Sequence, residues 1–361
     1  MKKIFGWILA ILLVTATSHA AETSANKPTI KIGVVAGITG DFQIWGESAR
    51  NALLLAEKQR LKNTKYNYEL VIEDCQSSIP NSVLAAKKLI SVNKVDCLIS
   101  LFVEMGQVVS PIADKAGVVH IGIATDPAIA KGPYNFTLYV SAEEYAQGMA
   151  DALKKKSIKK VALFPMKIAY CVNMEQAIKR IFAQNGIEIV SNLSYNPNQR
   201  DFRTMISQAK AKNPEMYILL TFTPTLELLA KQLKEAGINN YTGFEDIENS
   251  DQLALFNDRW FMSQPNADSH FADEYQRLFA SNYTIGAPNC YDAYNLLVMA
   301  YERAGAKVNG KPTAQQVAQE LEKIKGYQGA LGELSCRPGK MFWVHAVEKV
   351  ISNGRALSLP K

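Results

Sequence analysis

The sequence has few of the residues that metal and redox sites need. Its 361 residues include 5 cysteines and 4 histidines, and no two cysteines stand in a CxxC spacing. We therefore expect neither a metal site nor a cofactor. Because five is an odd number, at least one thiol lacks a partner within the chain. Cys290 and Cys336 are one candidate disulfide pair, and a buried free thiol is the alternative for every cysteine.

Strong charge of one sign is also missing. Lys and Arg number 40 against 34 Asp and Glu, a net charge of +6, and the basic residues are scattered in short runs such as Lys154–Lys156. Nucleic acid requires denser basic clusters, so we expect no nucleic-acid partner. The sequence lacks a Gly-x-Ser-x-Gly motif, and His120, His270 and His345 stand in no metal-ligand spacing. We therefore expect a protein that is not an enzyme, with His120 a core residue inside the apolar run 118–123.

Long apolar runs are confined to the N-terminus. A basic start at Met1–Lys3 precedes the apolar run Ile4–Val14, and Ser18-His19-Ala20 supplies small residues at the −3 and −1 positions of a cleavage site. The run is shorter than the ~20 residues that a membrane span needs. We predict a cleaved secretory signal over residues 1–20 and a periplasmic, soluble mature chain of charge +4, since Lys2 and Lys3 leave with the signal. An uncleaved anchor is the alternative.

The rest of the sequence alternates apolar β-branched runs with segments of helical periodicity. Strands are predicted over 30–36, 68–73, 96–102 and 118–123, and helices over 46–61, 82–92 and 107–116. Short buried runs that alternate with amphipathic helices are typical of a parallel sheet covered on both faces. The first part of the chain is therefore predicted to be an α/β domain.

A second α/β unit begins near residue 142. Ser141-Ala-Glu-Glu144 matches the start of a helix with a capping box. Strands are then predicted over 159–164, 187–191 and 216–221, with helices over 174–185, 202–212 and 226–236, and later helices over 269–281, 291–304 and 313–324 before an extended stretch over 341–350. A chain of this length fits two such domains.

Several short motifs carry a family resemblance. They are Ile32–Gly40 with Trp45-Gly46, Glu73-Asp74-Cys75, Ala124–Pro127, Asp201-Phe202-Arg203, Thr221–Pro224 and Tyr291–Tyr294. Together, in this order over residues 30–350, they resemble the leucine/isoleucine/valine-binding proteins. That family has the type I periplasmic binding protein fold, and its members deliver small molecules to ABC importers.

The resemblance implies an α/β fold with two doubly wound, Rossmann-like lobes joined by three crossovers. We place the crossovers near residues 139–141, 262–265 and 328–332. The N-terminal lobe is then 29–140 plus 266–328, and the C-terminal lobe is 141–265 plus 329–354. In such a fold the ligand lies between the lobes, at the carboxyl ends of the strands.

Ten residues are implied as ligand contacts. Thr125 matches the family threonine that contacts the amino-acid head group, and Glu245 matches the acid that pairs with its ammonium. The others are Trp45, Glu104, Gly106, Gln107, Ala124, Tyr170, Phe222 and Asp246. For the aromatic residues the alternatives are packing at the rim or in the core.

The loop over 102–107 departs from the family pattern. Relatives that hold an amino acid have serines there for the ligand carboxylate, whereas this chain has Glu104. Backbone N–H groups of Gly106 and Gln107 remain available to a carboxylate, which an inward-pointing Glu104 would repel. Alternatively, Glu104 satisfies free N–H groups at the start of the following helix.

Acids beside aromatic rings favour a cationic ligand. Glu104, Glu245 and Asp246 near Trp45 and Tyr170 would bind a cation by charge pairing and cation–π contact. We expect the monomeric solute-binding component of an ABC importer, which captures a small amine-bearing ligand by lobe closure and delivers it to an inner-membrane permease. The alternative is a ligand-sensing or envelope-enzyme-regulating protein of the same fold with no transport role.

Overall fold

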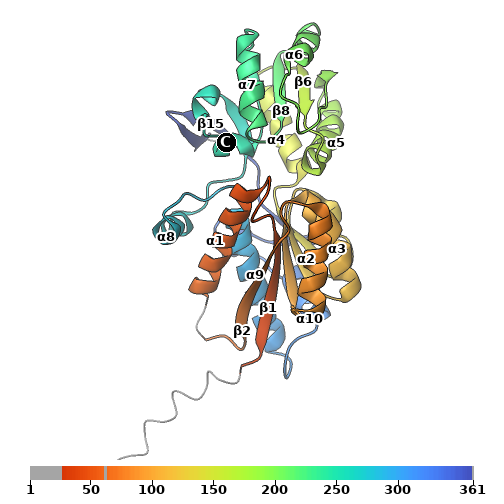
Figure 1. Ribbon diagram of the computed structural model, residues 1–361, viewed down its shortest axis with the longest axis vertical. Coiled ribbons are helices and arrows are strands. Elements are labelled where there is room, and N and C mark those ends of the chain that lie inside the picture. Colours follow the sequence, from red (N-terminus) through yellow and green to blue (C-terminus); the bar gives the residue numbers. More distant parts are fainter. Residues whose placement is uncertain (1–26, 61–62, 360–361) are drawn as a thin grey trace, which may run out of the picture.

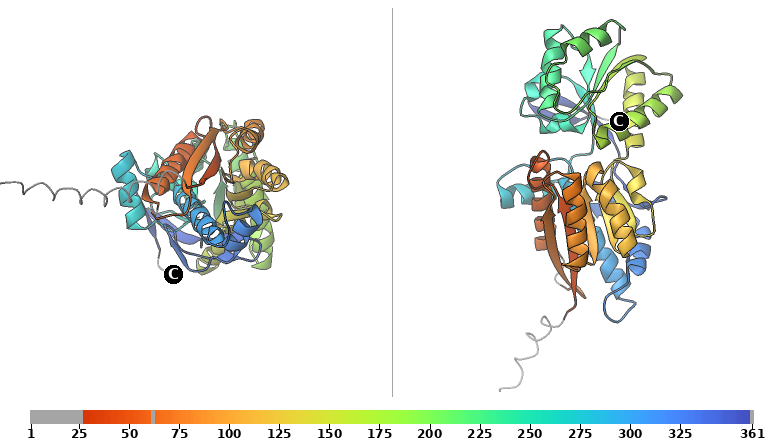
Figure 2. Two further views of the ribbon diagram at one scale, coloured as in Figure 1. Left: turned by 90° about the horizontal axis from the view of Figure 1, so that it is seen from below. Right: turned by 45° about the vertical axis from the view of Figure 1, so that its right-hand side comes forward.

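The chain folds into two α/β lobes that follow one another along the long axis of the molecule (Figure 1). This computed structural model describes residues 27–60 and 63–359. The predicted signal over residues 1–20 lies outside the described residues. Figure 2 shows that only a few chain segments connect the lobes. Across the described part of the chain, no helix combines the length and the apolar character that a membrane crossing requires.

The first lobe is built on a seven-stranded sheet in the order β13-β14-β5-β4-β3-β1-β2. The strands are β1 (Thr29–Ala36), β2 (Asn67–Asp74), β3 (Cys97–Leu101), β4 (Val119–Ile123), β5 (Asn135–Tyr139), β13 (Cys336–Arg337) and β14 (Met341–Trp343). The pair β13–β14 is antiparallel and every other neighbouring pair is parallel. The predicted parallel sheet is therefore confirmed.

Helices cover both faces of this sheet (Figure 1). On one face lie α1 (Gln43–Gln59) and α9 (Ala287–Gly305), on the other α2 (Ile79–Ser91) and α3 (Val103–Ala116), while α10 (Ala314–Glu322) packs against α9. Successive side chains of a strand point to opposite faces. Ile32 and Val34 of β1 accordingly join the core shared with α1 and α9, and Val35 joins the core under α2 and α3. Burial on both sides explains the unbroken apolar run of β1.

The second lobe has a parallel sheet in the order β7-β6-β8-β9. Its elements are α4 (Ala142–Lys155), β6 (Lys160–Pro165), α5 (Ala169–Gln184), β7 (Glu188–Asn192), α6 (Arg203–Lys210), β8 (Met216–Leu220), α7 (Thr225–Glu235) and β9 (Tyr241–Thr242). The Ser141 hydroxyl accepts the N–H of Glu144 at 3.1 Å, which confirms the predicted start of α4. A small antiparallel sheet of β10 (Trp260–Ser263), β15 (Val347–Ser352) and β16 (Arg355–Ser358) completes the lobe.

The chain passes between the two sheets at three places in its described part. The first two passages follow β5 and β10, at the predicted positions 139–141 and 262–265. The prediction for the third, residues 328–332, was wrong. β14 pairs with β5, which puts residues 336–343 in the first lobe, and the passage follows at 344–346. An edge strand such as β5 exposes unpaired backbone groups, and β14 satisfies them.

Three 3₁₀ helices, one α-helix and one hairpin connect these parts. They are the 3₁₀ helices η1 (Pro127–Ala130), η2 (Glu245–Asn249) and η3 (Leu253–Phe256), the helix α8 (Ser269–Phe279), and the hairpin of β11 (Tyr327–Gly329) and β12 (Gly332–Leu334). α8 packs against α1, although α1 ends at Gln59 and α8 begins only at Ser269. The later chain thus returns to the first lobe after the second passage.

The cysteines and the core histidine have structural roles. All five cysteines are free and buried, so Cys290 and Cys336 do not form the candidate disulfide. His120 lies between the Ser100 hydroxyl, 2.8 Å from Nε2, and the Asn135 side-chain oxygen, 3.1 Å from Nδ1. Burial lowers the pKa of His120 to about 4, which keeps it neutral. The prediction of a core residue is confirmed.

Gly46 allows α1 to sit against the loop that follows β1. A Cβ atom at this position would lie 2.0 Å from the carbonyl oxygen of Gly37. We expect Gly46→Ala to lower the free energy of unfolding by about 1–3 kcal/mol, because the helix must move away from the loop. Urea unfolding measures this, with Gly148→Ala as the control, since the one close approach of a Cβ there is to the flexible end of Met262. Equal unfolding midpoints in the two variants would contradict this prediction.

Candidate ligand-binding site

A cavity that is partly open to solvent lies between the lobes, and its space together with the open solvent at its mouth is about 520 Å³. The first lobe contributes segments that follow β3, β4 and β5, and the second lobe contributes segments that follow β6, β8 and β9. The lining residues are Trp45, Leu101, Phe102, Val103, Ile123, Ala124, Thr125, Tyr139, Tyr170, Phe222, Glu245, Asp246, Asn249, Ile285 and Gly286. The cavity is therefore at the carboxyl ends of the strands, where ligands of open α/β sheets bind.

Seven of the ten residues expected from the sequence line this cavity. They are Trp45, Ala124, Thr125, Tyr170, Phe222, Glu245 and Asp246. Glu104, Gly106 and Gln107 do not line it. The backbone N–H of Gly106 donates to the carbonyl of Phe102, the residue before α3. The side-chain amide of Gln107 donates to the carboxylate of Asp126 at 2.9 Å. These two residues are thus engaged within the first lobe.

Aromatic rings from both lobes form one wall of the cavity. Trp45 of α1 meets Phe222 of the second lobe edge to face, with ring centroids 5.8 Å apart, and Phe222 in turn lies 5.1 Å from Tyr170. Phe102 lies 6.3 Å from Trp45. Its backbone has φ of +68°, a conformation that costs a non-glycine residue free energy and that recurs at ligand sites.

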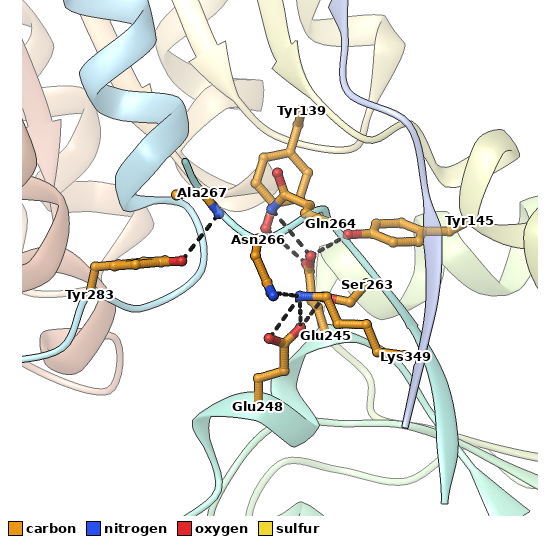
Figure 3. Close-up of polar contacts among 10 residues, drawn as sticks. All are labelled: Tyr139, Tyr145, Glu245, Glu248, Ser263, Gln264, Asn266, Ala267, Tyr283 and Lys349. Carbon is orange, nitrogen blue, oxygen red and sulfur yellow. Dashed lines mark hydrogen bonds and ion pairs between the residues drawn. The ribbon is translucent and has the colours of Figure 1, made fainter. Parts of the chain in front are cut away.

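Glu245, at the start of η2, is the most densely hydrogen-bonded carboxylate of the site. Its Oε1 accepts the hydroxyl of Tyr139 at 2.9 Å and that of Tyr170 at 3.4 Å. Its Oε2 accepts the hydroxyl of Tyr145 and the amide of Gln264, the latter at 3.4 Å. Figure 3 shows Tyr139, Tyr145 and Gln264 converging on this carboxylate. Four donors, from β5, α4, α5 and the residue after β10, hold the acid at the cavity.

Burial sets the ionisation of the two cavity acids. Burial raises the pKa of Glu245 to about 7, against the opposing effect of the hydrogen bonds from Tyr145 and Tyr139. The pKa of Asp246 is likewise raised by burial to about 7. Asp246 accepts the backbone N–H of Thr223 at 2.5 Å and the amide of Asn249 at 3.1 Å. A cation in the cavity would favour the charged form of both acids.

Glu104 lies in the first turn of α3 but acts across the lobes. Its Oε1 accepts the backbone N–H of Tyr170, in the first turn of α5, at 3.2 Å. Burial raises the pKa of Glu104, while the N–H groups of Glu104 itself, Tyr170 and Ala169 oppose that rise. Glu104 therefore has the second of the two roles that the sequence left open, at the start of α3, and it also accepts N–H groups at the start of α5 in the opposite lobe.

Thr125 makes a second contact between the lobes. Its hydroxyl donates to the side-chain oxygen of Asn173 in α5 at 3.3 Å. Thr125 follows β4 directly and lines the cavity beside Ala124. The carboxyl end of β4 and the start of α5 therefore face each other at the cavity.

A buried ion pair lies behind Glu245, at the passages between the lobes (Figure 3). Lys349 of β15, whose side chain is 2% exposed, places its Nζ 2.9 Å from both oxygens of Glu248 and 2.8 Å from the side-chain oxygen of Asn266. Glu248 also accepts the hydroxyl of Ser263. Glu248 thus contacts Ser263 at the second passage and Lys349 just after the third, while Glu245 contacts Tyr139 at the first. The residues of η2 therefore bond to the chain near all three passages.

Sequence reasoning missed three partners of Glu245. Tyr139, Tyr145 and Gln264 come from β5, α4 and the second passage. Only Tyr139 lines the cavity itself. A tyrosine next to an expected passage was the one available signal, because the other two become neighbours of Glu245 only in the folded chain.

The family model described as "Periplasmic binding protein" matches residues 29–346. The chain belongs to this periplasmic binding protein family. Membership implies an extracytoplasmic location and a role in solute binding. This confirms the resemblance on which the site residues were chosen.

Individual members of the periplasmic binding protein family are similar to this chain over most of its length. Leu/Ile/Val-binding protein homolog 3 of Brucella melitensis is 27% identical over 344 residues, covering 90% of this chain and 92% of the relative. Two solved structures share the fold. The leucine binding protein of Thermotoga maritima has a TM-score of 0.82 at 20% identity, covering 92% of this chain and 98% of that one. A Rhodopseudomonas palustris solute binding protein, solved with 3,4-dihydroxybenzoic acid, has a TM-score of 0.80 at 19% identity, covering 92% and 96%.

Proposed function

We propose that this chain is the solute-binding component of an ABC importer and that it captures a small amine-bearing ligand. The single observation that carries the ligand class is the buried carboxylate of Glu245 at a cavity walled by aromatic rings. An ammonium in such a place gains both charge pairing and contact with π faces. The ligand is an amino acid or a related basic amine.

Lobe closure is the proposed mechanism. Tyr170 and Glu245 belong to the second lobe, and Trp45 and Thr125 belong to the first, so a ligand that touches all four binds the closed form more tightly than the open form. That difference in affinity shifts the population toward closure. A membrane permease would then recognise the closed surface. The monomeric chain reaches the periplasm by the signal over residues 1–20, and no catalytic step is involved.

A ligand screen of the mature chain tests the proposal. After unfolding and refolding to remove bound solute, thermal unfolding is followed with amino acids, polyamines, quaternary amines and carboxylic acids without an amine. At a few hundred times its dissociation constant, a ligand stabilises the folded state by ~3 kcal/mol, a clear shift of the melting temperature. We expect shifts from compounds that carry an amine. Shifts from the carboxylic acids alone would refute the ligand class.

The transport role needs a separate measurement. Cells that carry or lack the gene are compared for uptake of the radiolabelled compound that gives the largest thermal shift. We expect uptake at low concentration to depend on the gene. Tight binding without any difference in uptake would favour a sensing role for the same site.

A further inference from the structure

Two backbone N–H groups beside the cavity, one in the first turn of α5 and one just before α7, already donate to carboxylates of the chain. Glu104 takes the N–H of Tyr170 in the first turn of α5, and Asp246 takes the N–H of Thr223 just before α7. Free N–H groups at helix starts are a common way for a protein to hold an anionic ligand group. At these two places a ligand carboxylate would have to displace an acid of the protein.

No basic side chain compensates for these acids. Among the described residues that line the cavity, none is Lys, Arg or His, while Glu245 and Asp246 are both present and buried. Lys349, the buried cation nearest to η2 in the hydrogen-bond network, is held by Glu248 and Asn266. A carboxylate in this cavity would add negative charge beside two acids with no cation to offset it, which is unfavourable in a poorly hydrated site.

The rest of the lining is suited to an apolar body. Leu101, Phe102, Val103, Ile123 and Ile285 line the cavity together with the aromatic wall. The polar groups that remain are few, and the hydroxyl of Thr125 is already paired with Asn173. A ligand with one charged end and an apolar remainder matches this distribution.

We infer that the ligand is an organic amine cation with an apolar or aromatic body and no carboxylate. This inference rests on the proposed function and narrows it. Of the two ligand classes proposed above, amino acids and basic amines, it keeps only the amines. The ammonium lies at Glu245 and Asp246, and the apolar body lies against Trp45, Phe102 and Phe222. Glu104 is a positioning residue for this specificity, since it does not line the cavity but its carboxylate takes the N–H of Tyr170, which does.

Matched pairs of compounds test the inference by isothermal titration calorimetry. Leucine is compared with 3-methylbutylamine, and phenylalanine with 2-phenylethylamine, so that each pair differs only by the carboxylate. We expect the amine of the better pair to bind at least tenfold more tightly than its amino acid. An amino acid that binds as tightly as its amine, or more tightly, would overturn the inference and leave the proposed function standing.

Benzoate and 3-methylbutanoate, which carry a carboxylate but no amine, test for failure of the proposed function itself. If these acids bind and all four amine-bearing compounds do not, the proposed function fails together with the inference. If none of the compounds binds up to millimolar concentration, an apolar amine of this size is also ruled out. The two kinds of failure are therefore distinguishable in one set of titrations.

Variants of Glu104 provide a second, independent readout. Glu104→Gln keeps the length of the side chain and an acceptor for Tyr170 but removes the charge, and Glu104→Asp keeps the charge as the matched control. We expect the preference for the amine over the amino acid to fall at least threefold in Glu104→Gln and to persist in Glu104→Asp. An unchanged preference in Glu104→Gln would show that Glu104 does not set the specificity. Circular dichroism confirms that each variant is folded.

Discussion

Glu245→Gln is expected to weaken binding of an amine cation by about 30-fold or more, because removing one partner of a buried charge pair costs about 2–5 kcal/mol. Glutamine keeps the shape of the side chain, and its single oxygen accepts from one of Tyr139 and Tyr145, which donate to different oxygens of Glu245. It removes the negative charge that the ammonium needs. Isothermal titration calorimetry with the tightest amine from the screen measures the change.

Asp251→Asn is the matched control for this variant. Asp251 follows η2 and is exposed, so its replacement removes the same unit of charge from the protein surface near the site. We expect its affinity to stay within a factor of two of the parent protein, since exposed charges act weakly through solvent. A Glu245→Gln protein that is folded and binds with parental affinity would disprove the role of Glu245.

The ligand-free protein is expected to lose stability as the pH rises from about 6.5 to 8. Burial raises the pKa of Glu245, Asp246 and Asp292 to about 7 each, above the value that each has in the unfolded chain. The folded state therefore binds more protons than the unfolded state up to that pH, and stability falls as these protons leave. Over this range each group contributes about 0.8 kcal/mol, roughly 2 kcal/mol for the three. Urea unfolding at both pH values measures the loss.

His120 limits the window in which this prediction applies. Its pKa is lowered from 6.5 to about 4, so its contribution to stability is lost as the pH falls between those values. From pH 6.5 to 8 it adds a smaller opposing rise of about 0.4 kcal/mol, because the unfolded histidine is still half protonated at pH 6.5. Asp292 does not line the cavity, and it accepts the backbone N–H of Ala330 at 2.8 Å. Asp292→Asn should therefore remove about a third of the loss, and a stability that rises toward pH 8 would contradict the assignment.

An amine ligand should reverse part of this pH dependence. Binding a cation favours the ionised forms of Glu245 and Asp246, so binding releases protons and the affinity rises with pH across the same range. The acid Asp292 keeps its own contribution, because it lies outside the cavity. The pH dependence of affinity and that of stability thus have opposite signs and a shared origin in two carboxyl groups.

Most of the fold follows from patterns that the sequence displays locally. The run Ile30–Ala36 is apolar at every position but two, as a strand covered on both faces requires. Ser141 followed by Glu144 marks the start of α4, because the cap uses atoms only three residues apart. Local chemistry of this kind is visible without the structure.

The position of the third passage between the lobes could not be predicted from local sequence patterns. The residues 341–350 do form strands, but the first of them pairs with β5 and the second with β10. An extended apolar segment has the same pattern in either sheet. Which edge it covers depends on which edge is unpaired once both lobes have formed, and that is a property of the assembled fold.

The site residues, too, are of two kinds: those that follow from local sequence patterns and those that depend on contacts between the lobes. Residues that directly follow strands, such as Thr125 after β4 and Phe222 shortly after β8, were found because strand ends can be read from the sequence. The partner of Glu104 was not found, because its carboxylate acts on a helix that starts 65 residues later in the other lobe. Side-chain contacts between the lobes produce no periodic pattern in the sequence from which they could be predicted.

The contact of Trp45 with Phe222 gives the protein an intrinsic optical signal. The indole belongs to the first lobe and its aromatic neighbour to the second, so the surroundings of the indole change when the lobes separate. Trp45 is 6% exposed here, and opening would bring water to it. Emission from an indole depends on the polarity and the solvent around it.

The other described tryptophans give a constant background. Trp260 lies under Lys156 and Trp343 under Arg337, and each pair belongs to a single lobe. Fluorescence from Trp45 can therefore be separated by replacing the other two with phenylalanine. The opening and closing of the unlabelled protein can then be followed in real time in a stopped-flow instrument, through the emission wavelength and intensity of Trp45.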